Sequence, residues 1–401
     1  MPKLLDKYFP FLIIITPIIH TVANVTTNYF PEASINPGLL RVIFLFFMVI
    51  SYTLIISKFP LKKLFIISSV FILYNLILVL FNDDVFTPLV NFVRVSLPIM
   101  FIFLAYVYIN NANKLVMLFK SIIIGIFIYS VNYIIANYFG LGASHYLDGS
   151  FYIGGASAGA SNEMAVYTLI GFSFLQFELN KKWRIFTVIS ITMSIIFLLL
   201  NLRRGSILVF IIGALVYLYY SGLNRNVIKF TMVISASLIL LYPIYNDALF
   251  DRFDIRSDQL TSIENVEQEG RVQEFIYVPI SLSNEGKWLT GTHNMNSSTY
   301  FGHRELHVGY MSILHGSGII GIFLFFLFIG YLIIESRSAY KRSIHKMDIK
   351  MRKQLYSILL MLIASLLIYL LTSRLHSFNL TLPFYLVFGS IISCFHNYDN
   401  N

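Results

Sequence analysis

Long apolar runs separated by short polar loops are the dominant pattern of this chain. Runs of about 17–25 apolar residues have the length of a helix that crosses roughly 30 Å of hydrocarbon. Because a bilayer offers no water to unpaired backbone groups, each run should be helical. The pattern predicts about twelve spans, at residues 9–25, 39–57, 64–81, 87–108, 115–138, 162–178, 185–201, 205–221, 228–245, 307–334, 355–373 and 381–396.

These spans predict an all-α polytopic membrane protein in three parts. Residues 1–245 form helices one to nine, 246–306 a large extracytoplasmic loop, and 307–401 helices ten to twelve. Charged residues make up only 12% of the chain, about half the share of a soluble domain. The single Cys394 excludes an internal disulfide and a multi-Cys metal site. The first apolar run lacks a clear cleavage site and is interpreted as a retained helix.

The loops alternate between basic and free of Lys and Arg. Predicted outer loops 26–38, 82–86 and 139–161 contain neither residue, whereas the intervening loops are basic and segment Arg337–Lys353 strongly so. Positively charged loops stay on the cytoplasmic side, so both termini are predicted inside and loop 246–306 outside. The net charge of +9 therefore reflects membrane topology and not nucleic-acid binding.

Some cations break this alternation and are functional candidates. Arg203 and Arg204 lie in a predicted outer turn, NLRRGS, beside a helix start at Gly205 or Ser206. Guanidinium groups and free helix N–H groups both bind phosphate, which favours a substrate role, although two snorkelling anchors remain the alternative. Arg374 occupies a second outer turn, and Arg304 lies near the end of the long loop; both are candidates for substrate binding.

Arg94 is predicted inside the fourth span, where a cation is expensive. It is expected to pair with an acid such as Glu163 or Asp84, in a structural or a substrate-binding role. Glu163 is either that partner or a group that binds sugar hydroxyls.

The sharpest motif begins at the end of the long loop, in HVGYMSILHGSGIIG. His307 is followed by Gly318 at +11 and Gly321 at +14, a spacing that none of the other eight histidines shows. An imidazole at this junction can titrate near the headgroups, and the glycines would let the helix approach a neighbour closely. The alternative is an interfacial histidine that caps the tenth helix.

The loop before His307 holds further candidates. Residues 269–282, EGRVQEFIYVPISL, predict a short amphipathic helix on the membrane face, limited by Pro279. Arg271 in this segment is otherwise a surface ion-pair partner of Glu269 and Glu274. The irregular spacing of His293, His303 and His307 indicates no metal site. The absence of Walker and GxSxG motifs argues against ATP-driven and nucleotide-sugar chemistry.

In this order of parts, the chain resembles the O-antigen polymerase and ligase superfamily. About twelve spans, an outer Arg-Gly turn (Arg203–Gly205), a large loop containing Gly270-Arg271 and Gly291, and His-x10-Gly-x2-Gly entering the tenth span carry the resemblance. The ligase form has Asn, Ser or Gln after the histidine, and Val308 here favours the polymerase.

The resemblance implies a glycosyltransferase with a GT-C-like architecture in the bacterial cytoplasmic membrane. It would transfer a growing glycan from undecaprenyl diphosphate to the next lipid-linked repeat unit at the periplasmic face, with inversion and without metal or cofactor. His307 would be the general base, Arg204 and Arg271 would hold the diphosphate, and Arg203, Arg94, Glu163, Arg304 and Arg374 would contact substrate. Its partners would be the two lipid-linked glycans, membrane lipids and a chain-length regulator.

Three other classes remain open. An O-antigen ligase or protein glycosyltransferase shares the architecture. A polysaccharide flippase or other transporter would place its charges at the midplane, with repeat symmetry. A non-catalytic envelope-assembly protein is the third.

Overall fold

The computed structural model describes residues 61–82, 85–139, 143–144, 151–152, 160–177, 180–201, 204–222, 225–258, 270–295, 306–372 and 378–397, together with Ile14 and Ile18. This part is all-helical apart from an antiparallel pair of two-residue strands, β1 (Ala143–Ser144) and β2 (Phe151–Tyr152). The main helices are α4 (Lys62–Val79), α5 (Phe86–Tyr108), α6 (Ala112–Phe139), α7 (Ala160–Phe174), α8 (Lys181–Asn201), α9 (Arg204–Ser221), α10 (Arg225–Asp258), α12 (Gly270–Asn284), α13 (Gly309–Arg342), α14 (Ile349–Thr372) and α15 (Phe378–Asn397).

Each apolar run predicted between residues 64 and 396 coincides with one of these helices. Six of the described helices are long and apolar enough to cross a membrane, and α7, α9, α10 and α15 contain shorter apolar stretches. These lengths and compositions are those of a multi-pass membrane protein. The runs predicted at 9–25 and 39–57 lie outside the described residues, except for Ile14 and Ile18.

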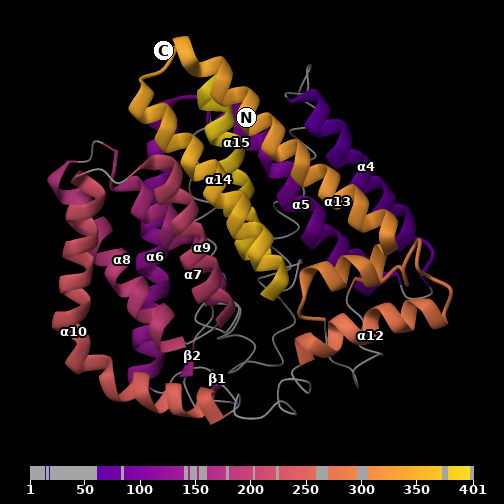
Figure 1. Ribbon diagram of the computed structural model, residues 1–401, viewed down its shortest axis with the longest axis horizontal. Helices are drawn as coiled ribbons and strands as arrows, with labels where there is room; N and C mark the ends of the chain where they lie inside the picture. Colours follow the sequence, from indigo (N-terminus) through magenta and orange to yellow (C-terminus); the bar gives the residue numbers. More distant parts are fainter. Residues whose placement is uncertain are drawn as a thin grey trace.

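The helices bring the polar segments to two ends of the bundle (Figure 1). The basic end, at the top of the figure, is where α13 and α15 finish and α14 begins. Contacts between Tyr220 and Tyr356, and between Gln176 and Gln354, join the ends of α9 and α7 to the start of α14 there. The loop end carries α12, β1 and β2. Alternating helix direction therefore separates the Lys- and Arg-rich connections from the long loop, as the charge pattern predicts.

Close helix pairs form one large core. α15 packs against α5, α14 against α9, and α13 against α4. At Gly389 of α15, an added Cβ would lie 2.1 Å from the Ile102 carbonyl oxygen of α5. Small residues at such crossings let helix backbones approach in an apolar environment.

Two boundaries in the long loop differ from the sequence prediction. α10 continues through Pro243 to Asp258, so the polar loop predicted to begin at 246 is helical in its first part. The predicted amphipathic helix is confirmed as α12, but it ends at Asn284 and contains Pro279 in its interior. Proline at position 279 removes one helical hydrogen bond, to the Phe275 carbonyl, and Phe275 lies on the exposed side of α12.

Candidate functional site at the start of α13

A buried carboxylate from α12 holds the start of α13. Glu274 is 1% exposed, and its oxygens accept the backbone N–H of His307 at 2.8 and 2.9 Å and that of Val308 at 2.8 Å. Val308 is the N-cap of α13, where intrahelical acceptors are lacking and the helix dipole favours negative charge. Glu274 therefore fixes the path of the chain into α13.

The same carboxylate lies beside the His307 imidazole. Oε1 of Glu274 is 3.5 Å from Nδ1 of His307, whose side chain is 35% exposed. At 3.5 Å this contact is longer than a normal hydrogen bond, and a small shift of either side chain on substrate binding would bring the ring nitrogen within hydrogen-bond range of the carboxylate. His307 lies two residues before α13, at the junction that the sequence predicted, and this geometry suits a general base.

Arg271 lies near this pair because of helix periodicity. It is half-buried on α12, three residues before Glu274, and side chains three apart on a helix are neighbours. The structure thus brings two of the three predicted catalytic residues, His307 and Arg271, to one region. Glu274 is buried and binds the α13 backbone, so this carboxylate does not lie on the surface as the sequence prediction had it.

Sequence reasoning did not assign Glu274 to the site, although a signal was present. Glu274, Val278 and Leu282 form a buried stripe at i, i+4 and i+8. A carboxylate on the apolar stripe of an amphipathic helix needs a buried partner, and the start of the next helix supplies it. Val278 and Leu282 pack with Leu306, Val308, Met311 and Leu314 in a small separate core that fastens α12 to α13.

α13 is broken at Gly318, which has φ 64° and ψ −166°. The preceding loop fills the break through its backbone. Ile319 N–H donates to the Trp288 carbonyl at 2.9 Å, and Thr292 N–H donates to the His315 carbonyl at 2.7 Å. The backbone groups freed by the break are therefore satisfied by loop residues 288–292, which locks the loop to α13.

Glycines make this contact sterically feasible. A Cβ at Gly318 would lie 2.2 Å from the Leu289 carbonyl oxygen, and one at Gly291 would lie 2.5 Å from the His315 carbonyl oxygen. The prediction that Gly318 and Gly321 allow close approach of a neighbouring helix is therefore corrected. Gly318 approaches a loop, and a Cβ at Gly321 would meet Ser317 of its own helix.

The histidines near the break have structural surroundings. His315 is buried, with Nδ1 2.7 Å from the Asn294 carbonyl oxygen and 3.0 Å from the Thr292 hydroxyl. Burial, with a smaller contribution from the charge of Lys287, lowers the pKa of His293 below its ordinary value. His307 differs from both in its surroundings, because it lies at the start of α13 beside the Glu274 carboxylate.

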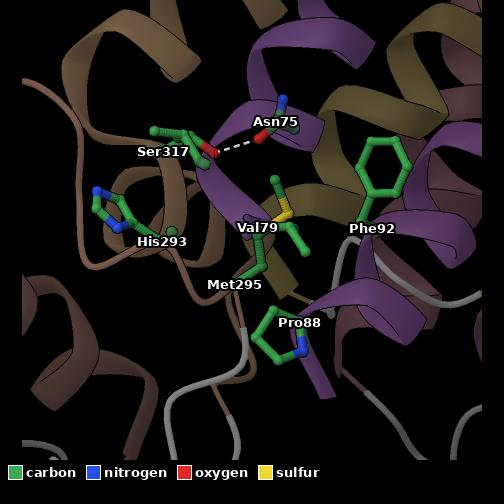
Figure 2. A pocket seen from close by; sticks show the side chains of 9 residues that line it. Asn75, Val79, Pro88, Phe92, His293, Met295 and Ser317 are labelled. Carbon is green, nitrogen blue, oxygen red and sulfur yellow. Dashed lines mark hydrogen bonds between the residues drawn. The ribbon is translucent and has the colours of Figure 1, made fainter. Parts of the chain in front are cut away.

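A pocket lies between the break, α4 and α5 (Figure 2). Asn75 and Ser317 are hydrogen-bonded to each other on one side, and His293 lies across the pocket from Phe92. Because Asn75 Nδ2 also donates to the Phe71 carbonyl at 2.7 Å, the Asn75 amide is already engaged on both sides. Val79, Pro88 and Met295 make the rest of the wall largely apolar, which favours a packing role.

Glu163 and Arg94 do not form the ion pair that the sequence allowed. Glu163, 2% exposed on α7, accepts a hydrogen bond from Tyr129 at 2.8 Å, whereas Arg94 is exposed on α5 and makes no ion pair with it. Arg94 lies near the start of α5, from which a long side chain can reach the headgroups. Asp84, the other predicted partner, lies outside the described residues.

Several predicted residues fall outside the described part of the chain. Arg203, Arg304 and Arg374 lie there, and for Arg204 only the backbone, as the first residue of α9, is described. Across the described residues, no three His, Cys, Asp or Glu side chains group as metal ligands. The metal-independent mechanism stays a prediction.

In comparisons with known proteins, no family model matches the chain, and no curated protein shows significant sequence similarity to it.

Proposed function

We propose that this multi-pass membrane protein is a glycosyltransferase that polymerises lipid-linked glycan repeat units. The observation that carries the proposal is the Glu274–His307 pair at the loop end of the bundle, with Arg271 one helical turn away. The order of spans, the long loop and the His-Gly-Gly spacing support the polymerase class through the resemblance described above.

In the proposed reaction, the acceptor hydroxyl oxygen attacks the anomeric carbon of the donor glycan. His307 takes the hydroxyl proton, and the bond from that carbon to the diphosphate breaks with inversion. With Nδ1 turned to Glu274, Nε2 is the nitrogen that accepts the proton, and the carboxylate stabilises the imidazolium that forms.

The diphosphate leaves with both bonding electrons, so cations must stabilise it. Arg271 is the described candidate, and Arg204 at the start of α9 is the second. A planar guanidinium donates to two phosphate oxygens at once, which suits this role.

The broken helix α13 favours a second candidate, a transporter, because discontinuous helices often bind cargo at their exposed ends. Here loop residues already occupy those ends, since Trp288 and Thr292 bind the backbone on either side of Gly318. Because the loop leaves no free helix end at the break for cargo, the enzyme is favoured over the transporter.

Reconstituted protein supplied with undecaprenyl-diphosphate-linked repeat units tests the proposal. We expect a ladder of glycans on a gel, with free undecaprenyl diphosphate released in step. Transfer only to a lipid A core acceptor would indicate a ligase. Movement of the lipid-linked unit across the membrane without bond formation would indicate a transporter and contradict the proposal.

A further inference from the structure

The basic end of the bundle holds a buried cation that has no assigned role. Arg352, in the first turns of α14, is 8% exposed, and its Nε and Nη1 have no hydrogen-bond acceptor among the described residues. Removing a guanidinium from water without giving its N–H groups acceptors is costly. A ligand with several acceptor oxygens would remove that cost.

The nearest acid along the chain serves another purpose. Asp348 lies one turn before Arg352, but its carboxylate accepts the N–H groups of Lys350 at 2.9 Å and Met351 at 3.2 Å, and caps α14. Within the described residues, no ion pair joins it to Arg352. The guanidinium instead lies over the ring of Tyr340, 5.2 Å from the centroid. The ring attracts the cation electrostatically, and this attraction favours the position of the guanidinium beside Tyr340.

The surroundings are strongly basic and border exposed apolar residues. Exposed cations on the same segment are Arg337, Lys341, Arg342, Lys346, Lys350 and Lys353. Ile344, between α13 and α14, and Ile349, the first residue of α14, are 45% and 61% exposed. Positive charge next to exposed aliphatic side chains matches the two parts of an anionic lipid, a phosphate and acyl chains.

We propose that Arg352 binds the phosphate of an anionic phospholipid headgroup at the basic end of the bundle. The guanidinium donates to the phosphate oxygens, Tyr340 lies against the guanidinium, and the exposed lysines supply long-range attraction. The acyl chains lie against the apolar surface beside Ile349. This site is separate from the proposed catalytic pair at the loop end and does not depend on it.

The experiment uses the full-length protein in detergent, with bound lipid counted by native mass spectrometry. Wild type should bind phosphatidylglycerol at least about tenfold more tightly than phosphatidylcholine. Its unfolding midpoint should rise when phosphatidylglycerol is added but not when phosphatidylcholine is added. Equal affinity for both lipids would overturn the proposal without any variant. Equal protection by inorganic phosphate would overturn the assignment to a lipid.

Two variants distinguish specific binding by Arg352 from nonspecific attraction by the basic surface. Arg352→Lys keeps the charge but loses the planar fork, and we expect about tenfold weaker binding of phosphatidylglycerol. Lys350→Gln removes a charge from the exposed neighbour and should weaken binding by no more than about fivefold. A larger effect of Lys350→Gln than of Arg352→Lys would show that only diffuse electrostatics act, and would overturn the proposal.

Discussion

Glu274 links the local chemistry of this protein to its folding. Its carboxylate binds the backbone of His307 and Val308 and lies 3.5 Å from the His307 imidazole. One side chain therefore both contacts the proposed base and fixes the start of α13. Substitutions at the two residues should separate these contributions.

His307→Ala should abolish polymer formation while the protein still inserts and binds the lipid-linked donor. Removing a general base typically costs about two to four orders of magnitude in rate. Gel ladders and donor binding measure the two effects. His293→Asn is the matched control, because asparagine tolerates the positive φ of 67° at that position, and its ladder should be normal. Equal defects in both variants would contradict a special role for His307.

Glu274→Gln should lower both stability and rate. The amide offers one acceptor oxygen where two carboxylate oxygens now bind backbone N–H groups, so about 1–3 kcal/mol of stability should be lost. Its neutral side chain also stabilises the imidazolium less. Thermal unfolding and turnover test this, with exposed Glu285→Gln as control. An unchanged rate would leave Glu274 with a purely structural role.

At the scale of elements, the break in α13 determines how the long loop meets the bundle. The His315 carbonyl and the Ile319 N–H on either side of Gly318 bind Thr292 and Trp288. Because α12 also packs on the first half of α13, the loop and the broken helix form one unit around His307. A change at the break should therefore reach the proposed catalytic pair of Glu274 and His307.

Gly318→Ala should destabilise the protein by about 1–3 kcal/mol or more, since positive φ is strained for alanine and its Cβ would meet the Leu289 carbonyl. Gly330→Ala, in the same helix with nothing within 4 Å of the added Cβ, should leave stability unchanged or raise it by up to about 1 kcal/mol. Thermal unfolding midpoints of both variants, measured in detergent, test this difference. A similar midpoint for both would mean that the loop can leave the break without cost.

At the scale of the whole molecule, charge separates the two ends. Asn284 is exposed at the end of α12, and Lys350 is exposed at the start of α14. If the basic end faces the cytoplasm, Asn284→Cys should react with an impermeant maleimide in whole cells, and Lys350→Cys only after permeabilisation. The native Cys394 is 1% exposed and should give little background. The reverse labelling pattern would place the proposed site on the wrong side for lipid-linked repeat units.

In the described part of the chain, the sequence by itself determined the apolar helices, because a span is a local property of about twenty apolar residues. It also predicted α12 and the position of His307, since both depend on short-range patterns. Only the tertiary structure showed that Glu274 contacts His307, 33 residues away in the sequence. It also showed that the loop backbone hydrogen-bonds to α13 at the break at Gly318. Such pairings depend on how α12 packs against α13, and no local pattern of hydrophobicity or charge specifies that contact.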